Sequence, residues 1–241
     1  MRQVLRGLST ILIVAGALLL ADAVVTLVWQ EPGSAFLAQQ QQDRLSNKLD
    51  DLEKQAPRGL EHRALAALAG EQERIAFLAR TFRRKTSEGD PIGRIKIPKI
   101  GASYVVVYGT NHDDLTKGPG LYPDTVFPGI PGTTAIAGHR TTYLAPFRHI
   151  DELKSGDEID VEMPYAKFVY SVEKSMVVLP SAVWVTHRVG YDRLVLSACT
   201  PLYSASHRII VFSRLSKVEP RGAARGGATQ TLVEHPQGLA Q

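Results

Sequence analysis

Between residues 90 and 216 the chain breaks repeatedly into short stretches of apolar or alternating side chains, and this pattern restricts the fold most strongly. Apolar and acidic residues alternate over 157–163, while 103–108 and 167–178 are rich in valine and aromatic residues. Similar stretches occupy 92–97, 133–138, 193–196 and 208–215. Clusters of glycine, proline, asparagine and aspartate separate them. About seven or eight short strands with few helical intervals predict an all-β sandwich or barrel.

An apolar run over residues 8–29 bears on where the rest of the chain resides. At about 1.5 Å of rise per residue it forms a helix of about 33 Å, long enough to cross the hydrocarbon core of a bilayer. Arg2 and Arg6 precede the run, so the positive-inside rule places the N-terminus in the cytoplasm and everything after Trp29 outside. We predict an uncleaved, single-pass membrane anchor over 1–30. Cleavage is the alternative, because Ala21-Asp22-Ala23 has the small-x-small form of a signal-peptidase site.

Residues 31–89 are predicted to form a helical, glutamine-rich spacer on the outer side of the membrane. Pro57-Arg58-Gly59 divides it into two helical pieces, and leucine and other apolar residues recur at helical spacing in both, at Leu45, Leu49, Leu52, Leu65, Leu68, Ile75, Leu78 and Phe82. We interpret the spacer as a solvated stalk that lifts the β-rich domain of residues 90–216 off the membrane. A helix that packs on the domain, or lies on an anionic surface, is the alternative. Residues 217–241 lack periodicity and predict a disordered tail.

Composition excludes several classes of protein. The chain has 241 residues but only one cysteine, so it contains no internal disulfide and no four-cysteine zinc or iron–sulfur site. The chain has 28 lysine and arginine residues against 24 aspartate and glutamate residues. Because this excess of positive charge is small, we expect no nucleic-acid partner. His139 and His149 lack a third ligand at a suitable spacing, and the GxSxG, HExxH, P-loop and GxGxxG motifs do not occur. We therefore expect neither a metal nor a cofactor.

The single cysteine, Cys199, lies at the end of an apolar stretch, and Pro201 ends the strand just after it. A free thiol in an oxidising compartment is either buried or used. His139 likewise ends an apolar stretch, so the two residues can meet at one rim of a barrel and form a nucleophile–base pair. Arg208 opens the next strand nine residues after Cys199, and a hairpin of that length returns it beside the thiol. A guanidinium there would stabilise a negatively charged oxygen.

The region from about 90 to 216 resembles the sortases, the cysteine transpeptidases of Gram-positive surfaces. The matching segments are IGRIKIPKIG at 92–101, GTNHDDLTKGPGLYP at 109–123, the run from PGTTAIAGHRTTY at 131–143 to residue 159, LVLSACTP at 194–201 and HRIIVFSRL at 207–215. The GHRTTY and CTP segments are most similar to class E sortases of actinobacteria. The CTP and HR segments also resemble the pilin-polymerising class C, although the sequence has no C-terminal membrane span and no aromatic lid motif after an Asp-Pro.

This resemblance implies an eight-stranded sortase-type β-barrel with short helices. It implies that Cys199 attacks the Thr–Gly carbonyl of an LAXTG- or LPXTG-like sorting signal and forms a thioacyl-enzyme. His139 would act as acid and then as base, and Arg208 would hold the substrate or the oxyanion. The acceptor would be an amino group of peptidoglycan or of its lipid-linked precursor. The expected substrate-binding residues are Tyr143, Ala198 and Thr200.

One position departs from the family pattern. The family usually has threonine immediately before the catalytic cysteine, and here that position is Ala198. We nevertheless expect an active enzyme, because a backbone N–H at that position is unaffected. The alternatives are a pilin-polymerising enzyme, a hydrolase that releases the acyl group to water, and a wall-binding β-domain without catalytic activity.

Overall fold

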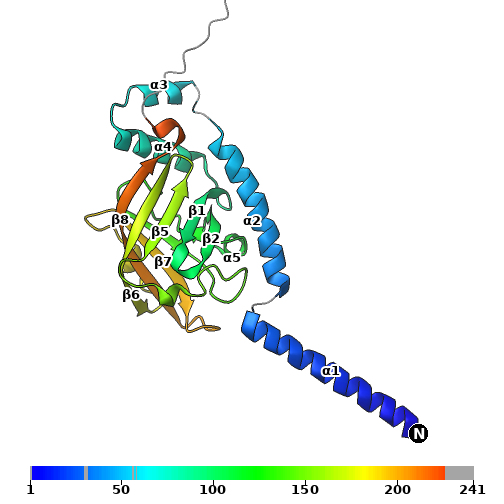
Figure 1. Ribbon diagram of the computed structural model, residues 1–241. Coiled ribbons are helices and arrows are strands. Elements are labelled where there is room, and N and C mark those ends of the chain that lie inside the picture. The colour runs from blue at the N-terminus through cyan, green and yellow to red at the C-terminus, as the bar shows by residue number, and fades with distance from the viewer. Residues whose placement is uncertain (1, 30–31, 56, 58, 226–241) are drawn as a thin grey trace, which may run out of the picture.

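The computed structural model describes residues 2–29, 32–55, 57 and 59–225 (Figure 1). Its centre is a closed barrel in which the strands follow the order β1-β2-β3-β4-β7-β8-β6-β5, and β5 pairs again with β1. This confirms the predicted all-β, eight-stranded barrel. The strands are β1 (Pro91–Ile97), β2 (Ala102–Tyr108), β3 (Gly120–Leu121), β4 (Thr133–Ala137), β5 (Glu158–Met163), β6 (Ala166–Val178), β7 (Arg193–Thr200) and β8 (His207–Pro220).

Two strand assignments differ from the sequence prediction. The two-residue β3 lies within a segment that reads as a turn, because Gly120 and Leu121 are too few to show an alternation. Strand β8 continues to Pro220, where it pairs with Ala166, so the tail does not begin at 217 as predicted. A short 3-10 helix, η4 (Gly222–Ala224), follows, and Ala224 is fully buried in the main core. The remainder of the predicted tail, 226–241, lies outside the described residues.

The barrel wall separates two apolar clusters. The main core contains Leu194, Leu196 and Ala198 of β7, while Val195 of the same strand belongs to a smaller cluster with Ile210 and others. Since successive side chains of a strand point to opposite faces, the smaller cluster lies on the outer face. The connection between β6 and β7, which contains the 3-10 helix η3 (Val183–Thr186), covers that face through the buried Val185.

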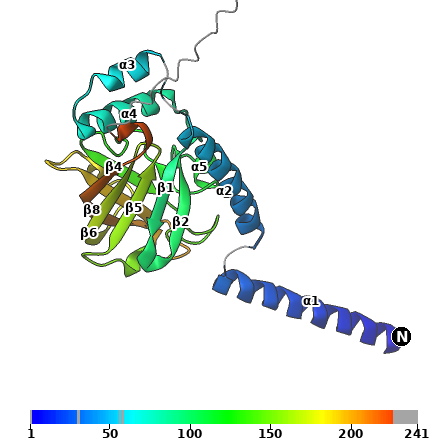
Figure 2. The same cartoon turned by 45° about the horizontal axis from the view of Figure 1, so that its top comes forward.

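Helix α2 (Pro32–Glu53) packs against the barrel and is not a solvated stalk, so this interpretation of the spacer was wrong. Leu45 and Leu49 are buried against Val105 and Val107 of β2. The side-chain amide of Gln42 bonds to the backbone of Val105 as a neighbouring strand would: its Nε2 donates to Val105 O at 3.0 Å, and its Oε1 accepts from Val105 N at 2.7 Å. Figures 1 and 2 show α2 running alongside β1 and β2. The leucine spacing that predicts the helix therefore also marks the face of α2 that is buried against the barrel.

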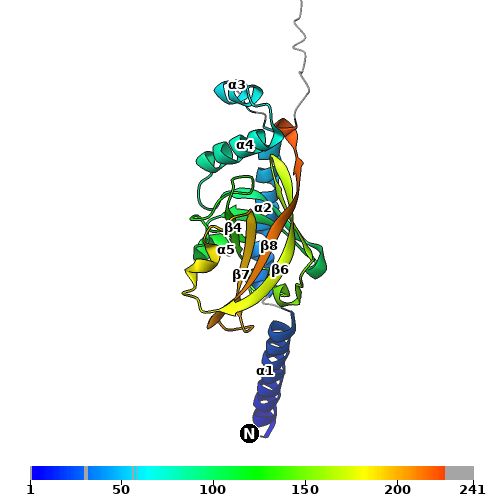
Figure 3. The ribbon, with the colours of Figure 1, turned by 90° about the vertical axis from the view of Figure 1, so that its left-hand side faces the viewer.

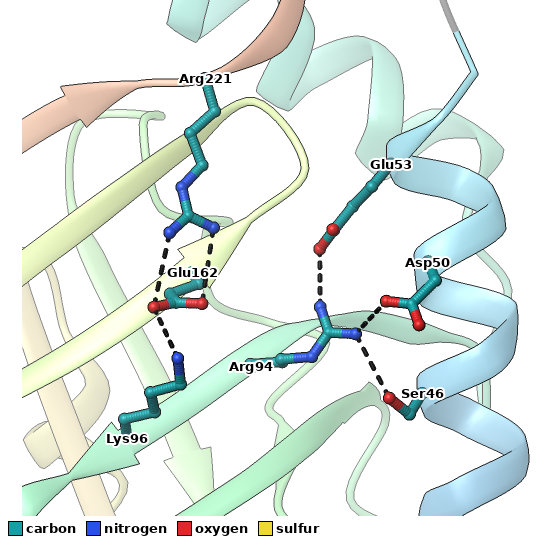
Figure 4. Close-up of polar contacts among 7 residues, drawn as sticks. All are labelled: Ser46, Asp50, Glu53, Arg94, Lys96, Glu162 and Arg221. Carbon is teal, nitrogen blue, oxygen red and sulfur yellow. Dashed lines mark hydrogen bonds and ion pairs between the residues drawn. The ribbon is translucent and has the colours of Figure 1, made fainter.

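Two charged clusters fasten the outer segments to the barrel (Figure 4). Arg94 of β1 pairs with Asp50 and Glu53 and donates to Ser46 Oγ at 3.3 Å, all on α2. Glu162 of β5 accepts from Lys96 Nζ at 3.0 Å and pairs with Arg221 at 3.4 Å, which holds the segment after β8 in place.

The second half of the spacer also belongs to the barrel domain. Helices α3 (Leu60–Ala66) and α4 (Glu71–Lys85) lie at the end of the barrel away from α1 (Figures 1 and 3). Ile75 and Ala79 of α4 are buried in the main core. Arg83 donates from Nη2 to Pro123 O at 2.9 Å, and Arg74 from Nε to Ala224 O at 3.3 Å. The helical region therefore closes one end of the barrel.

Helix α1 (Arg2–Trp29) contains one segment, Arg6–Val24, that is long and apolar enough to cross a membrane, with a mean hydropathy of 2.1. None of this segment is buried within the protein. A signal sequence near an N-terminus has the same length and composition. The remaining short helices are the 3-10 helices η1 (Pro98–Ile100) and η2 (Ile150–Glu152) and the single-turn α5 (His112–Leu115).

Candidate active site

Cys199 and Arg208 stand opposite each other on neighbouring strands. In the antiparallel ladder of β7 and β8, Cys199 is the register partner of Arg208. Cys199 shares the face of Val195 by alternation, and Arg208 shares the face of Ile210, so both point to the outer side of the barrel. Both residues are half-buried. The structure thus places these two predicted site residues side by side.

His139 reaches the same edge from β4. Strands β4 and β7 are parallel, and their last register pair joins Ala137 with Ser197, followed by a hydrogen bond from Gly138 N to Ser197 O at 3.0 Å. His139 and Cys199 each lie two residues beyond that last pair. The parallel register therefore brings the three predicted catalytic residues to one end of β4, β7 and β8, strands that are neighbours in Figure 3.

The turn after β4 requires a glycine. A Cβ atom on Gly138 would lie 2.5 Å from the ring of Phe147, a residue that is fully buried in the main core. Phe147 N in turn donates to His139 O at 3.0 Å. The phenyl ring of Phe147 therefore packs directly on the backbone of Gly138, just before His139. The backbone N–H of Phe147 fixes the carbonyl of His139.

The imidazole of His139 has a depressed pKa. Burial lowers it first, because desolvation disfavours the charged form, and the neighbouring His112 of α5 lowers it further. Among the described residues, the buried Nε2 of His139 has no hydrogen-bond partner. Buried polar side-chain atoms are mostly hydrogen-bonded in folded proteins, so this nitrogen is an exception.

Tyr143 lies between the two histidines. Its ring centroid is 5.2 Å from that of His139 and 6.2 Å from that of His112. Tyr143, Leu144 and Ala145 have positive φ angles of 50°, 66° and 42°, which are unusual for three successive residues other than glycine. Tyr104 steadies this turn, since its hydroxyl donates to Leu144 O at 3.2 Å. The predicted substrate-binding tyrosine is therefore held against His139 by a strained turn.

The other two predicted substrate-binding residues point away from the thiol. Ala198 is only 3% exposed, and its side chain lies in the main core on the inner face of the barrel. Thr200 accepts a hydrogen bond at its Oγ1 from Nη1 of Arg140 at 3.2 Å. A substrate contact at Ala198 would therefore involve its backbone, and Thr200 is linked to the residue after His139.

Two neighbours of the site, His112 and Arg140, were not singled out by sequence reasoning. His112 belongs to the segment between β2 and β3, and no spacing relates it to His139. Arg140 lies inside the GHRTTY run and is only 4% exposed, a burial that no local pattern in the sequence indicates. Across the described ranges 2–29, 32–55, 57 and 59–225, no three histidine, cysteine or acidic side chains cluster as metal ligands.

A closed barrel with its single cysteine at the end of one strand and an arginine opposite defines a β-barrel protein with a candidate thiol nucleophile. The sequence model of the Sortase domain matches residues 95–216, which is half of the chain, so the chain belongs to the sortase family. Sortases are cysteine transpeptidases.

Similarity to solved structures of sortase E indicates a class E-like member. The structure of sortase E from Streptomyces avermitilis is 32% identical, with a TM-score of 0.51, over 58% of this chain and 99% of that one. Sortase E1 from Streptomyces coelicolor, solved with a tripeptide in its active site, is 30% identical with a TM-score of 0.53, over 56% of this chain and 94% of that one. Sortase D of Bacillus subtilis is 33% identical over 54% of this chain and 66% of its own length, slightly less than two thirds.

Proposed function

We propose that this chain is a membrane-anchored sortase that cleaves an LAXTG- or LPXTG-like sorting signal between Thr and Gly and joins the acyl group to a cell-wall amine. The observation that supports it most directly is the register: Cys199 faces Arg208 across β7 and β8, and His139 lies at the matching position beyond β4. A thiol nucleophile, a proton-transfer group and an oxyanion stabiliser have to lie near one another, and a shared position at one end of three neighbouring strands supports such an arrangement.

In the acylation step, the Cys199 thiolate attacks the carbonyl carbon of the threonine. A C–S bond forms, and the electron pair of the carbonyl moves to its oxygen, where Arg208 stabilises the negative charge. The carbonyl then re-forms as the C–N bond to glycine breaks. The protonated imidazole of His139 gives its proton to the departing amine, which leaves the thioacyl-enzyme and a neutral His139.

In the second step, an acceptor amine attacks the thioester carbonyl. Neutral His139 takes the proton that the nitrogen loses, the C–S bond breaks, and the Cys199 thiolate is regenerated. The depressed pKa of His139 favours the neutral form that this step needs. The acceptor is an amino group of peptidoglycan or of its lipid-linked precursor.

We further propose that α1 is the anchor and that the barrel lies outside the cytoplasmic membrane. The length and hydropathy of Arg6–Val24 support this topology, and Arg2 and Arg6 mark the cytoplasmic side. Intact-mass measurement of the mature protein tests it: a start at Val24 would show cleavage after Ala23 and contradict the anchor.

The enzymatic proposal is tested with the full chain in detergent micelles, incubated with an LAXTG peptide and then with a glycine oligomer as acceptor. We expect a covalent adduct by intact mass spectrometry, its resolution to a ligated peptide, and neither product in Cys199→Ala. An adduct resolved only to free acid would identify a hydrolase. The absence of any adduct with both LAXTG and LPXTG peptides would contradict the proposed substrate class.

A further inference from the structure

Arg140, which follows His139, is a buried charge with an unusually complete set of hydrogen-bond partners. It is only 4% exposed. Its Nε and Nη2 donate to Arg148 O at 3.1 and 3.0 Å, Nη2 also donates to Asp151 Oδ1 at 2.6 Å, and Nη1 donates to Thr200 Oγ1 at 3.2 Å. A buried charge destabilises the folded protein strongly unless it is paired and hydrogen-bonded. The contacts of Arg140 meet that requirement.

These contacts connect three segments of the chain. The guanidinium extends from the turn after β4 to the 3-10 helix η2 region and to the last residue of β7. Thr200 is the neighbour of Cys199, and Arg140 is the neighbour of His139. The hydrogen bond between Arg140 and Thr200 therefore joins the residues that follow the two candidate catalytic side chains.

The backbone does not provide this connection. Among the described residues, the last backbone hydrogen bond between the β4 and β7 segments is that from Gly138 N to Ser197 O, one position before His139. His139 and Cys199 thus lie beyond the ladder that aligns their strands. Arg140 is a planar fork with several donors, which fixes the geometry of its acceptors more strictly than a lysine does.

We propose that Arg140 is a positioning residue that holds His139 opposite Cys199 through its hydrogen bond to Thr200, with Arg148 O and Asp151 fixing the guanidinium. Arg140 does not touch the reacting atoms. Its loss would let the turn after β4 move relative to the end of β7, and small displacements of catalytic groups lower rates strongly. The inference rests on the proposed function, since it concerns the same Cys199–His139 pair.

The test uses two readouts on the full chain, one of which does not depend on a sorting signal. Because Cys199 is the single cysteine, the rate of its alkylation by iodoacetamide as a function of pH reports the thiol alone. The variants are Arg140→Lys, Thr200→Val and Thr200→Ser, with His139→Gln as the reference for an uncoupled thiol. The second readout is kcat and KM with an LAXTG peptide.

We expect the alkylation profiles of Arg140→Lys and Thr200→Val to shift from the wild-type profile towards that of His139→Gln. Thr200→Ser keeps the acceptor oxygen and restores the wild-type profile. With the peptide, Arg140→Lys and Thr200→Val should lower kcat at least about tenfold while KM changes less than about threefold. Arg94→Lys is the matched control, because it weakens a similar guanidinium fork between β1 and α2.

The positioning role would be overturned if Arg140→Lys and Thr200→Val kept the wild-type alkylation profile while the profile of His139→Gln was shifted. A His139→Gln profile identical to wild type would also overturn it, because the histidine would then not act on the thiol. If the wild-type chain fails to process any peptide while the alkylation profiles behave as expected, the proposed function fails and the positioning role stands. Thermal unfolding of each variant separates these effects from loss of fold.

Discussion

Cys199 and Arg208 are register partners across β7 and β8, and the arginine side chain hydrogen-bonds to backbone carbonyls of the hairpin that joins the two strands. Its Nη1 donates to Ala205 O and to His207 O, both at 3.0 Å. Directly opposed side chains on an antiparallel pair have Cβ atoms about 4.5–5.5 Å apart. The hairpin carbonyls therefore hold the guanidinium on the outer face of the barrel, on the strand next to that of the thiol.

Arg208→Lys is the first prediction. A lysine keeps the charge but loses the planar fork that satisfies the two hairpin carbonyls and faces an oxyanion at the same time. By comparison with the loss of an oxyanion-hole donor, we expect kcat to fall by about 10²–10³, with a smaller change in KM. Steady-state kinetics with an LAXTG peptide provide the measurement.

Arg214→Lys is the control for that substitution. Arg214 lies further along β8, where it pairs with Glu173 at 2.7 Å and its side chain is 52% exposed. We expect kcat within about twofold of wild type, because exposed ion pairs contribute little. An equal loss of kcat in both variants would show that the effect of Arg208→Lys is structural.

The second prediction concerns His112 and the pKa of His139. Burial lowers this pKa, and the charge on His112 lowers it further, so His112→Gln should raise it partway towards the ordinary value. We expect the limb of the kcat/KM profile that reports His139 to move to higher pH. His62→Gln, on the exposed face of α3, should leave the profile unchanged.

The same shift has a consequence for stability. Since the folded pKa of His139 is depressed, the unfolded chain binds the proton more readily in the histidine range. The free energy of unfolding therefore falls as pH decreases through that range. His112→Gln should make the fall shallower, which urea unfolding over the same pH range would reveal. An unchanged slope and an unchanged activity profile would contradict the contact.

The barrel could be predicted from the sequence because its strands are short, apolar or alternating, and separated by turn residues. Residues 157–163 show the period of two that one buried face imposes, and 208–215 contains the short apolar run of a strand buried on both faces. Strand β3 could not be predicted, since two residues show no period. The positions of Cys199 and His139 at strand ends also followed from sequence, but their mutual alignment depends on the parallel register of β4 and β7, which no local pattern specifies.

The packing of the helices is the clearest case in which sequence reasoning failed. The spacing of Leu45 and Leu49 predicts an amphipathic helix but does not identify what covers its apolar face. The structure shows that Val105 and Val107 of β2 cover it. Arg140 was overlooked for a related reason: a lone arginine has no periodicity, and its burial depends on acceptors at 148, 151 and 200.

Leu49→Ala is the third prediction and tests whether α2 belongs to the folded domain. Leu49 is fully buried against the outer side of β2, so its truncation removes apolar contacts and leaves a cavity. We expect the free energy of unfolding to fall by about 2–5 kcal/mol. Leu37→Ala, at a site that is 63% exposed on the same helix, should change it by less than about 0.5 kcal/mol. Equal stabilities would restore the stalk interpretation.

The fourth prediction concerns the acid sensitivity that Glu162 gives the barrel. Burial alone would raise the pKa of this carboxyl group, but the hydrogen bond from Lys96 and the charge of Arg221 outweigh it and leave the pKa below its ordinary value. A carboxylate with a depressed folded pKa stabilises the protein above its unfolded pKa, and this contribution disappears as pH falls through the folded value. The cluster joins β1, β5 and the segment after β8 (Figure 4).

Glu162→Gln should therefore lower the free energy of unfolding at neutral pH, because Lys96 and Arg221 lose their shared carboxylate. The difference from wild type should shrink as pH decreases below the ordinary glutamate value of 4.5, where the wild-type carboxyl group also becomes protonated. Urea unfolding at stepwise lower pH measures both. Glu158→Gln, an exposed position on the same strand, should follow the wild-type curve at every pH. A Glu162→Gln deficit that stayed constant with pH would mean that the glutamate stabilises the barrel by packing rather than by charge.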